Sequence, residues 1–284
     1  MPHVAELGDR SIFMVRDGEP VSVPRSELFA ATEADAFVSE PVNETLALSF
    51  NCYVVRDRSG TTLIDCGIGN QKRRAYPGYD MRTSRFLDDL SLGGVAPDRI
   101  DRVIFTHLHP DHVGWSTIPS REGWSPTFRN ARYIMSRTEY ARLEQRSRSP
   151  RSDGWLIETF RDSLLPLMEA GQIELVATGA DLGDGFSLIP APGHSCDHAL
   201  VQIDCGSAVA VALGDLLHHP VQFATPTLNS AYDENPALAL SSRKRCLEML
   251  SRSGALVLTA HFLESPWGEI RPREGGGYTL ARWQ

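Results

Sequence analysis

Short apolar runs rich in β-branched residues alternate with polar turn residues along most of the chain. Runs of this length, bounded by Gly, Asp, Asn or Pro, are typical of strands in a packed sheet. The runs Cys52–Val55 and Thr61–Ile64 flank the segment RDRSG and are expected to form a hairpin. The pattern predicts strands at Leu46–Val55, Thr61–Ile64, Arg102–Thr106, Arg132–Met135, Phe186–Ile189, Leu200–Ile203, Ala208–Leu213 and Ala255–Thr259.

Helical periodicity lies between these strands. In Thr83–Leu92 the apolar residues fall at helical spacing, and Thr138–Arg146, Trp155–Ala170 and Pro236–Leu250 are further predicted helices. The proline that begins the last of them suits a first-turn position. Strands with interspersed helices indicate a mixed α/β architecture.

The chain shows neither a linker-like composition shift nor a short-period repeat, so residues 1–284 are expected to form a single domain. The range 116–154 contains several prolines and is interpreted as an irregular insertion that could fold over a site. The Gly- and Pro-rich tail after His261 is expected at the surface or at a sheet edge.

Composition and charge narrow the class of protein. Hydrophobic residues make up 42% and charged residues 23% of the 284 residues, which is ordinary for a globular protein. A net charge of −8 argues against a nucleic-acid surface, and no apolar run approaches membrane-spanning length. The N-terminal segment lacks a signal-peptide pattern, and five cysteines without CxxC spacing read as reduced thiols. We therefore expect a cytoplasmic protein with a small-molecule substrate and no nucleic-acid or membrane partner.

The segment THLHPDHVG carries the strongest chemical signal. His107, His109, Asp111 and His112 fall within six positions, directly after an apolar strand. The proline and glycine in this segment force the chain to turn, so His107 and His109 can face one point while Asp111 and His112 face another. Neutral imidazoles with a carboxylate suit Zn²⁺ and its neighbours in the first transition row.

Three further residues of the same kinds follow other apolar strands. His194 comes after Phe186–Ile189 and a PAPG turn, Asp215 closes the run AVAVALGD, and His261 closes ALVLTAH. Functional groups of α/β folds gather at such strand ends. Taken alone, each residue is as well explained by a structural role as by metal binding. Together with the first cluster, the three indicate a metal site.

This series of motifs resembles the metallo-β-lactamase superfamily, from the region of Asp65 to His261. The resemblance implies a four-layer αβ/βα sandwich, in which two mixed β-sheets are flanked by helices and the metals lie at one sheet edge. It also implies two divalent metal ions, Zn²⁺ first and Mn²⁺, Co²⁺ or Fe²⁺ as alternatives, and it is compatible with a homodimer. By this resemblance one metal is held by His107, His109 and His194, the other by Asp111, His112 and His261, and Asp215 bridges them.

The finer resemblance concerns the substrate. A set of seven His and Asp ligands is unlike that of the true β-lactamases, and the segment GDLLHHPVQ with Asp233 downstream is most similar to acyl-homoserine lactonases and methyl parathion hydrolases. Two metals lower the pKa of a bridging water and supply hydroxide as the nucleophile, and Asp111 could pass a proton to the leaving group. The sequence thus predicts a hydrolase of small ester-like substrates, a lactone first, with phosphotriesters and thioesters as alternatives.

Several neighbouring residues are expected to support the ligands or to line the pocket. Asp65 is expected either to accept a hydrogen bond from a ligand imidazole or to cap a turn. By the resemblance His198 is structural support, and His218 and His219 are expected to stabilise their loop, with one reaching the pocket as the alternative. Trp115 is the first candidate for an apolar pocket wall, ahead of the weaker candidates Phe50, Trp124, Trp155 and Phe223.

Two other classes of function fit the same fold. Iron-containing relatives carry out oxygen chemistry, but the flavin-linked ones carry an extra domain for which this chain has no room. A non-catalytic binding protein is the third hypothesis, and the complete set of seven ligands speaks against it.

Overall fold

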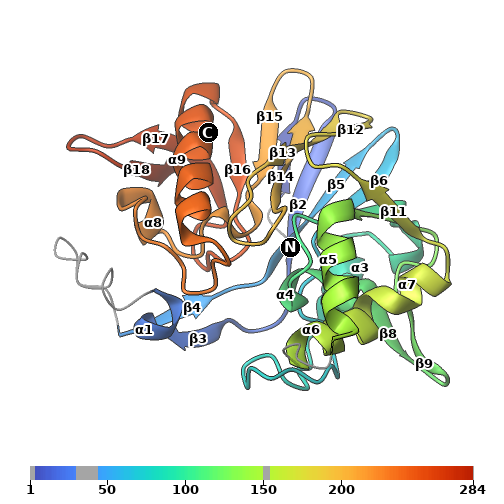
Figure 1. Cartoon of the computed structure of the whole chain (residues 1–284). Coiled ribbons are helices and arrows are strands. Elements are labelled where there is room, and N and C mark those ends of the chain that lie inside the picture. Colours follow the sequence, from blue (N-terminus) through green and yellow to red (C-terminus); the bar gives the residue numbers. More distant parts are fainter. Residues whose placement is uncertain (1–3, 30–43, 150–153, 284) are drawn as a thin grey trace.

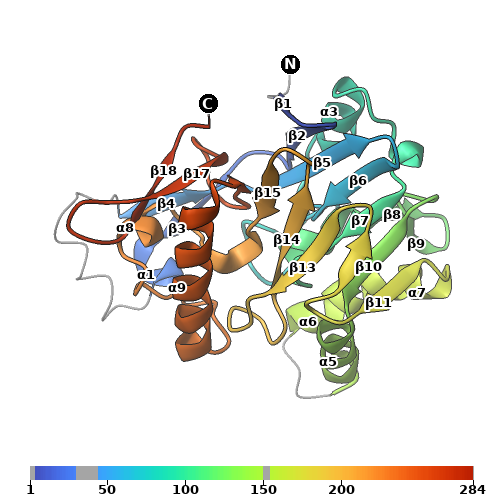
Figure 2. The same ribbon diagram turned by 90° about the horizontal axis from the view of Figure 1, so that it is seen from above.

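Two mixed seven-stranded β-sheets face each other and carry helices on their outer faces (Figure 1). The computed structural model describes residues 4–29, 44–149 and 154–283. Helix α9 (Pro236–Ser253) lies on one side of the pair of sheets and α5 (Arg137–Ser147) on the other, which gives the layer order helix, sheet, sheet, helix (Figure 2). The predicted four-layer α/β sandwich is therefore confirmed.

Sheet one is antiparallel at one end and parallel at the other. Strands β6, β7, β10 and β11 run parallel, while β5 and β6 form the predicted hairpin with Asp57 opposite Gly60. The carboxyl ends of the parallel strands therefore meet at one edge of the sheet. The strand order is β1 (Val4–Leu7), β2 (Arg10–Arg16), β5 (Asn51–Asp57), β6 (Gly60–Ile64), β7 (Arg102–Ile104), β10 (Arg132–Ser136) and β11 (Ile173–Val176).

Sheet two also brings several carboxyl ends to one edge. Strands β13 and β15 are both antiparallel to β14, and β15 is parallel to β16, so β13, β15 and β16 point the same way. The order is β12 (Asp181–Gly183), β13 (Phe186–Pro190), β14 (Ala199–Asp204), β15 (Val209–Ala212), β16 (Leu256–Leu258), β17 (Trp267–Pro272) and β18 (Tyr278–Ala281). The tail after His261 supplies the edge strand β18, as expected, and also the inner strand β17, which was not expected.

Apolar side chains fill the three spaces between the layers. Ile12, Val55 and Ile104 of sheet one pack against Val201 and Leu256 of sheet two. A second cluster joins sheet one to α3 (Phe86–Leu92), α5 and the helical stretch formed by α6 (Gly154–Thr159), the π-helix η3 (Phe160–Leu164) and α7 (Leu165–Glu169). A third joins sheet two to α9 and α8 (Val221–Ala224). Burial of these faces fixes the separation of the two sheets.

The predicted strand Leu46–Val55 is wrong as one element. It is divided into β4 (Thr45–Leu48), which pairs with β3 (Val21–Pro24), and β5 in sheet one. Between them the backbone N–H groups of Ser49 and Asn51 donate to the carbonyls of His261 and Ala260 at 3.0 and 2.8 Å. This crossing fixes the loop after β16 next to the end of sheet one.

The other predicted elements are present with shifted ends, and the predicted range Trp155–Ala170 contains α6, η3 and α7. Helix α9 begins as expected, with Pro236 in its first turn and the Asn235 side chain accepting a hydrogen bond from Leu238 N at 3.1 Å. The remaining short elements are α1 (Arg25–Leu28), η1 (Pro97–Arg99), α4 (Pro110–Val113), η2 (Gly114–Ser116) and η4 (Gly214–Leu216).

The range 116–154 contains more regular structure than its composition suggests. The hairpin of β8 (Thr117–Ser120) and β9 (Gly123–Pro126) is followed by β10 and α5, while residues 150–153 lie outside the described ranges. The assignment of an insertion and of a single domain stays a prediction. Among the described helices, none has the length and apolar character needed to cross a membrane.

Candidate metal centre

The loop after β7 turns through the one-turn helix α4. Pro110 occupies its first position, and His112 N donates to His109 O at 3.0 Å. The turn directs His107 and His109 toward one group of side chains and Asp111 and His112 toward another. This is the division that the THLHPDH segment predicts.

Loops from sheet two complete both groups. His194 follows β13, Asp215 follows β15 and His261 follows β16. In one group, ligand atoms of His107, His109, His194 and Asp215 lie within 4.8 Å of one another; in the other, those of Asp111, His112 and His261 do so. The structure therefore brings together all seven residues that the sequence singles out, and each group could hold a metal ion.

The two carboxylate oxygens of Asp215 face different groups. Oδ2 lies 3.1 Å from His194 Nε2 and 3.8 Å from His107 Nε2. Oδ1 lies 2.9 Å from His112 Nε2 and 3.0 Å from His261 Nε2. A carboxylate in this position can serve both groups at once, one oxygen to each.

The remote nitrogens of these imidazoles contact fixed acceptors. His112 Nδ1 lies 2.8 Å from Asp65 Oδ2, and His261 Nδ1 lies 2.9 Å from the carbonyl of Ser49. His194 Nδ1 lies 3.1 Å from Asp233 Oδ1. Such contacts keep the proton on Nδ1 and leave the Nε2 lone pair for a metal. For Asp65, the structure favours the contact with a ligand imidazole.

The backbone around Asp215 is shaped by two contacts. Gly214 has a φ of +50°, and a Cβ there would come within 2.5 Å of His198 Nε2. Because that space is free, His198 Nε2 accepts a hydrogen bond from Asp215 N at 2.9 Å. The ring also contacts the carbonyl of Ala191 through Nδ1 at 3.2 Å. His198 is thus structural support, as expected.

Burial and neighbouring charge set the protonation of the site. Burial, and then the neighbouring imidazoles, lower the pKa of His107 and His109 well below the ordinary value. For Asp215, burial acts to raise the pKa, but His112, His261 and His194 outweigh it and hold the pKa well below its usual range. Burial acts to lower the pKa of His112, His194 and His261, but Asp215 outweighs it and raises the pKa of all three, so these rings balance the charge of the carboxylate before a metal binds. A divalent cation would take over this role, with release of the protons.

A cavity of about 430 Å³ opens onto both groups. Its wall is mostly apolar and aromatic, with Trp155, Tyr76 and Tyr232 among the residues that line it. Arg74 also lines it, but its Nη1 and Nη2 bind Asp162 at 2.6 and 3.0 Å, so its charge is already paired.

The expectation that Trp115 lines this cavity is wrong. Its ring is buried, stacks on Phe86 at 5.4 Å between centroids, and donates from Nε1 to Asp17 at 2.9 Å. Of the weaker aromatic candidates, Trp155 does line the cavity, with its ring 5.4 Å from that of His109. Phe50 packs behind His261, with ring centroids 5.7 Å apart.

Trp124 and Phe223 lie in other contacts. The Lys72 Nζ atom lies 3.9 Å from the centre of the Trp124 ring, and the Phe223 ring packs against Phe262. His218 lines the cavity, which agrees with the alternative that one of the two histidines reaches the pocket, whereas His219 contacts its loop by accepting from Val221 N at 3.3 Å.

Two supporting residues were not assigned a role by the sequence. Tyr79 donates from its hydroxyl to Asp111 Oδ2 at 3.1 Å, and Asp233 binds both His194 and, at 3.2 Å, Arg243 Nη2. Tyr79 lies in an irregular loop without a motif, so no sequence signal could have identified it. Asp233 lies downstream of GDLLHHPVQ and is part of the finer resemblance, which is the sequence signal for its role.

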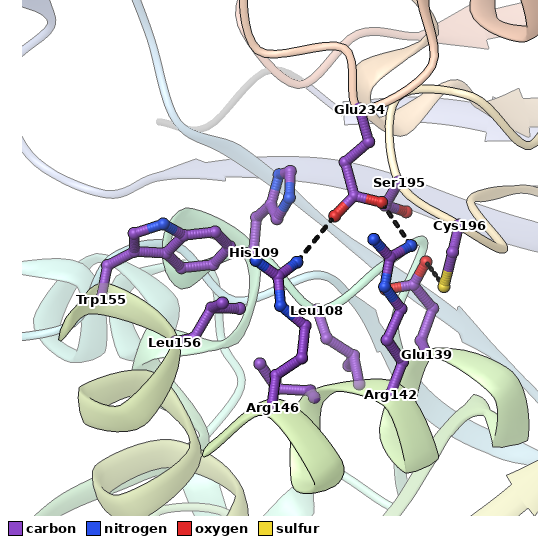
Figure 3. Close-up of a pocket in the computed structure, with 11 residues that line it drawn as sticks. Leu108, His109, Glu139, Arg142, Arg146, Trp155, Leu156, Ser195, Cys196 and Glu234 are labelled. Carbon is purple, nitrogen blue, oxygen red and sulfur yellow. Dashed lines mark hydrogen bonds and ion pairs between the residues drawn. The ribbon is translucent and has the colours of Figure 1, made fainter. Parts of the chain in front are cut away.

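A smaller pocket beside His109 is bounded by ion pairs (Figure 3). Arg142 and Arg146 extend from α5 toward Glu234, with N–O distances of 2.6 and 3.5 Å. Glu234 N also donates to His194 O at 3.1 Å. These pairs connect the helix layer of sheet one to the loop that supports His194.

Comparison with known proteins agrees with this arrangement. The family model described as the metallo-β-lactamase superfamily matches residues 47–261. An N-acyl homoserine lactonase of Bacillus thuringiensis is 24% identical over 226 residues, which cover 75% of this chain and 81% of that protein.

Two solved structures show the same fold. Hydrolase AbOPH of the β-lactamase superfamily superposes with a TM-score of 0.82 at 22% identity, covering 100% of this chain and 97% of that one. AidC, a dizinc quorum-quenching lactonase in complex with a product, N-hexanoyl-L-homoserine, has a TM-score of 0.80 at 19% identity, covering 100% and 97%.

Proposed function

The chain belongs to the metallo-β-lactamase superfamily and is a metallo-hydrolase, and from this premise we propose that it uses two divalent metal ions to hydrolyse a small lactone. The observation that carries the proposal is the position of Asp215, whose two oxygens face two separate groups of imidazoles. This arrangement suits a pair of metals and has no evident use without them.

The donor atoms fit such metals. His107 Nε2 and His112 Nε2 are buried and have no hydrogen-bond partner among the described residues, although buried polar atoms nearly always have one. A metal ion would satisfy both. We propose that His107, His109 and His194 hold one metal, Asp111, His112 and His261 the other, and Asp215 both. Zn²⁺ is the first choice for these donors.

Bound metals would supply hydroxide as the nucleophile and polarise the substrate carbonyl. Asp111 lines the cavity, and in this proposal its carboxylate takes up the proton of the attacking hydroxide and passes it to the leaving alkoxide. The Tyr79 hydroxyl orients this carboxylate by donating to Oδ2. His194, through Asp233, and His112, through Asp65, are held so that Nε2 faces the reacting centre.

The cavity supports a neutral substrate with an apolar part. Aromatic and aliphatic side chains, including Leu48 and Val23, form most of its wall, and the guanidinium of Arg74 is occupied by Asp162. An anionic substrate would find no free cation in this wall among the described residues. The lactonase relatives act as a second, independent support for a lactone.

A neutral phosphotriester is the second candidate, because the same apolar, uncharged wall would accommodate it. A thioester is the third. The cavity wall does not separate these classes from lactones, since all present a polarised C=O or P=O beside an apolar group.

The proposal is tested with metal-loaded protein and a substrate panel. The panel contains N-acyl homoserine lactones, simple γ-lactones, an aryl phosphotriester and a neutral thioester, and metal content is measured in the same sample. We expect metal-dependent ring opening with a larger kcat/KM for lactones than for the other classes. Asp111→Asn is expected to reduce turnover, while Asp101→Asn, an exposed position directly before β7, serves as the control. Inert lactones beside a rapidly hydrolysed phosphotriester or thioester would reject the lactone.

A further inference from the structure

His218 is a buried imidazole whose ring lacks a hydrogen-bond partner in the described part of the chain. Its exposure is 2%, and neither Nδ1 nor Nε2 has a partner among the described residues. Buried polar groups in folded proteins are nearly always hydrogen-bonded, so an unpartnered one requires an explanation. Its adjacent neighbour His219 differs, because its Nδ1 accepts from Val221 N at 3.3 Å.

Two of the proposed metal ligands also have a buried ring nitrogen that lacks a hydrogen-bond partner among the described residues. His107 Nε2 and His112 Nε2 also have no hydrogen-bond partner within the described ranges, although they lie 3.8 and 2.9 Å from oxygens of Asp215. His218 Nε2 lies 3.2 Å from Asp215 Oδ2, again without the alignment of a hydrogen bond. Atoms that converge on one metal ion lie this close to each other without bonding among themselves.

The ring of His218 is placed within the ligand set. Its centroid is 4.9 Å from that of His194, and it stacks on His261 at 5.5 Å with an interplanar angle of 6°. Ligand atoms of Asp215, His218 and His261 all lie within 4.8 Å of one another. This triad overlaps both metal groups at the cavity wall.

The local backbone fixes this position. His218 N donates to Gln222 Oε1 at 2.6 Å, and Gln222 Nε2 donates to Leu228 O at 2.9 Å. The loop after Asp215 is thereby closed by a buried amide that holds the backbone of His218, while the ring itself packs against His194 and His261. A preorganised imidazole of this kind is a feature of a built site.

We propose that His218 is an additional protein ligand of the metal centre, coordinating through Nε2 beside Asp215. This inference rests on the proposed function, which supplies the metals. One metal then gains an imidazole beyond the seven ligands, which raises its coordination number. Higher coordination favours Mn²⁺, Fe²⁺ or Co²⁺ over Zn²⁺, which in protein sites is most often four-coordinate.

The test measures metal binding rather than turnover. Competition with a chromophoric chelator gives the affinities of the wild-type chain, of His218→Phe and of the matched control His219→Phe. We expect His218→Phe to lower the affinity for one of the two metal ions by about tenfold or more. His219→Phe should leave both affinities within about twofold of the wild-type values. In the Co²⁺-loaded protein, the visible absorption should strengthen in His218→Phe alone, because it increases as the coordination number falls.

His218→Asn is measured in parallel, with circular dichroism as the check of folding, and is expected to show the same loss if His218→Phe does not fold. Unchanged affinity and unchanged Co²⁺ absorption in a folded His218 variant would overturn the ligand assignment, and a fall in kcat alone would place His218 on the substrate instead. A wild-type chain that binds no divalent metal would contradict the proposed function itself. The two failures are therefore distinguishable.

Discussion

Asp65→Asn removes one negative charge at a position whose hydrogen bonds decide which ring nitrogen of His112, a candidate metal ligand, carries the proton. Asp65 Oδ1 accepts from Thr106 N at 2.9 Å, and Oδ2 accepts from Thr106 Oγ1 and from His112 Nδ1, both at 2.8 Å. Asn has nearly the same shape and tolerates the left-handed backbone of this residue, whose φ is +53°. The substitution therefore alters chemistry rather than packing.

The amide of Asn cannot satisfy all three contacts. If its oxygen keeps Thr106 N, its NH₂ group faces His112 Nδ1 and favours the tautomer with the proton on Nε2, where the metal would bind. If the amide flips, the NH₂ group opposes the N–H of Thr106, and an unmet buried N–H costs about 1–3 kcal/mol. The first arrangement is therefore favoured. Losing such a partner of a metal ligand typically weakens metal binding 10- to 100-fold, or about 1.4–2.8 kcal/mol.

The assay is chelator competition on wild type, Asp65→Asn and the control Asp101→Asn. Asp101, which directly precedes β7, also accepts a backbone N–H through Oδ2, from Thr61 at 2.7 Å, but it has no imidazole contact among the described residues. We expect Asp65→Asn to bind one of the two metal ions more weakly than wild type does, and the control to bind both with unchanged affinity. Equal affinities in all three proteins would refute the reasoning that Asp65 sets the tautomer of His112.

Three further outcomes are expected. Tyr79→Phe, which loses the donor to Asp111 Oδ2, should lower kcat/KM about tenfold at unchanged metal content, and an unchanged value would remove Tyr79 from the mechanism. Burial lowers the pKa of Lys72 from 10.5 to about 8, against the raising effect of Asp162. Between these values the unfolded chain binds more protons, so the Tm of wild type should rise relative to that of Lys72→Met from pH 8 to 10. A difference in Tm between the two proteins that does not change with pH would contradict this. Removing the metal with a chelator should lower the Tm, and added Zn²⁺ should restore it. If free metal was present at 100 times its Kd, the loss in the free energy of unfolding is about 2.7 kcal/mol.

Much of the fold could be predicted because buried strands and helices have recognisable patterns of apolar residues. Strands such as β13, β14 and β15 are apolar runs between turn residues, and the amphipathic α9 has a proline and an asparagine at its start. The candidate ligands could be found for the same reason. They follow these runs directly, and their residue types are unusual at such positions.

Other features depend on contacts that sequence periodicity does not contain. The break between β4 and β5 arises because Ser49 and Asn51 bond to the loop after β16, more than 200 positions away. Trp115 follows the histidine cluster but faces the core, because Phe86 and Asp17 offer it a stacking face and an acceptor. Adjacency in sequence to a site residue is thus a poor guide to the direction of a side chain.

The division of the candidate ligands between the sheets has a mechanical consequence. His107, His109, Asp111 and His112 come from a loop of sheet one, whereas His194, Asp215 and His261 come from loops of sheet two. Each of the two groups proposed to hold the metals draws on both sheets, whereas the triad of Asp215, His218 and His261 comes from sheet two alone. The spacing of the donor atoms is therefore set by the apolar core between the sheets, and the distances of about 3 Å around Asp215 are a property of that packing. Conversely, a metal bound at either group would join the two sheets at their shared edge, which is why metal affinity and the cohesion of the sandwich should change together.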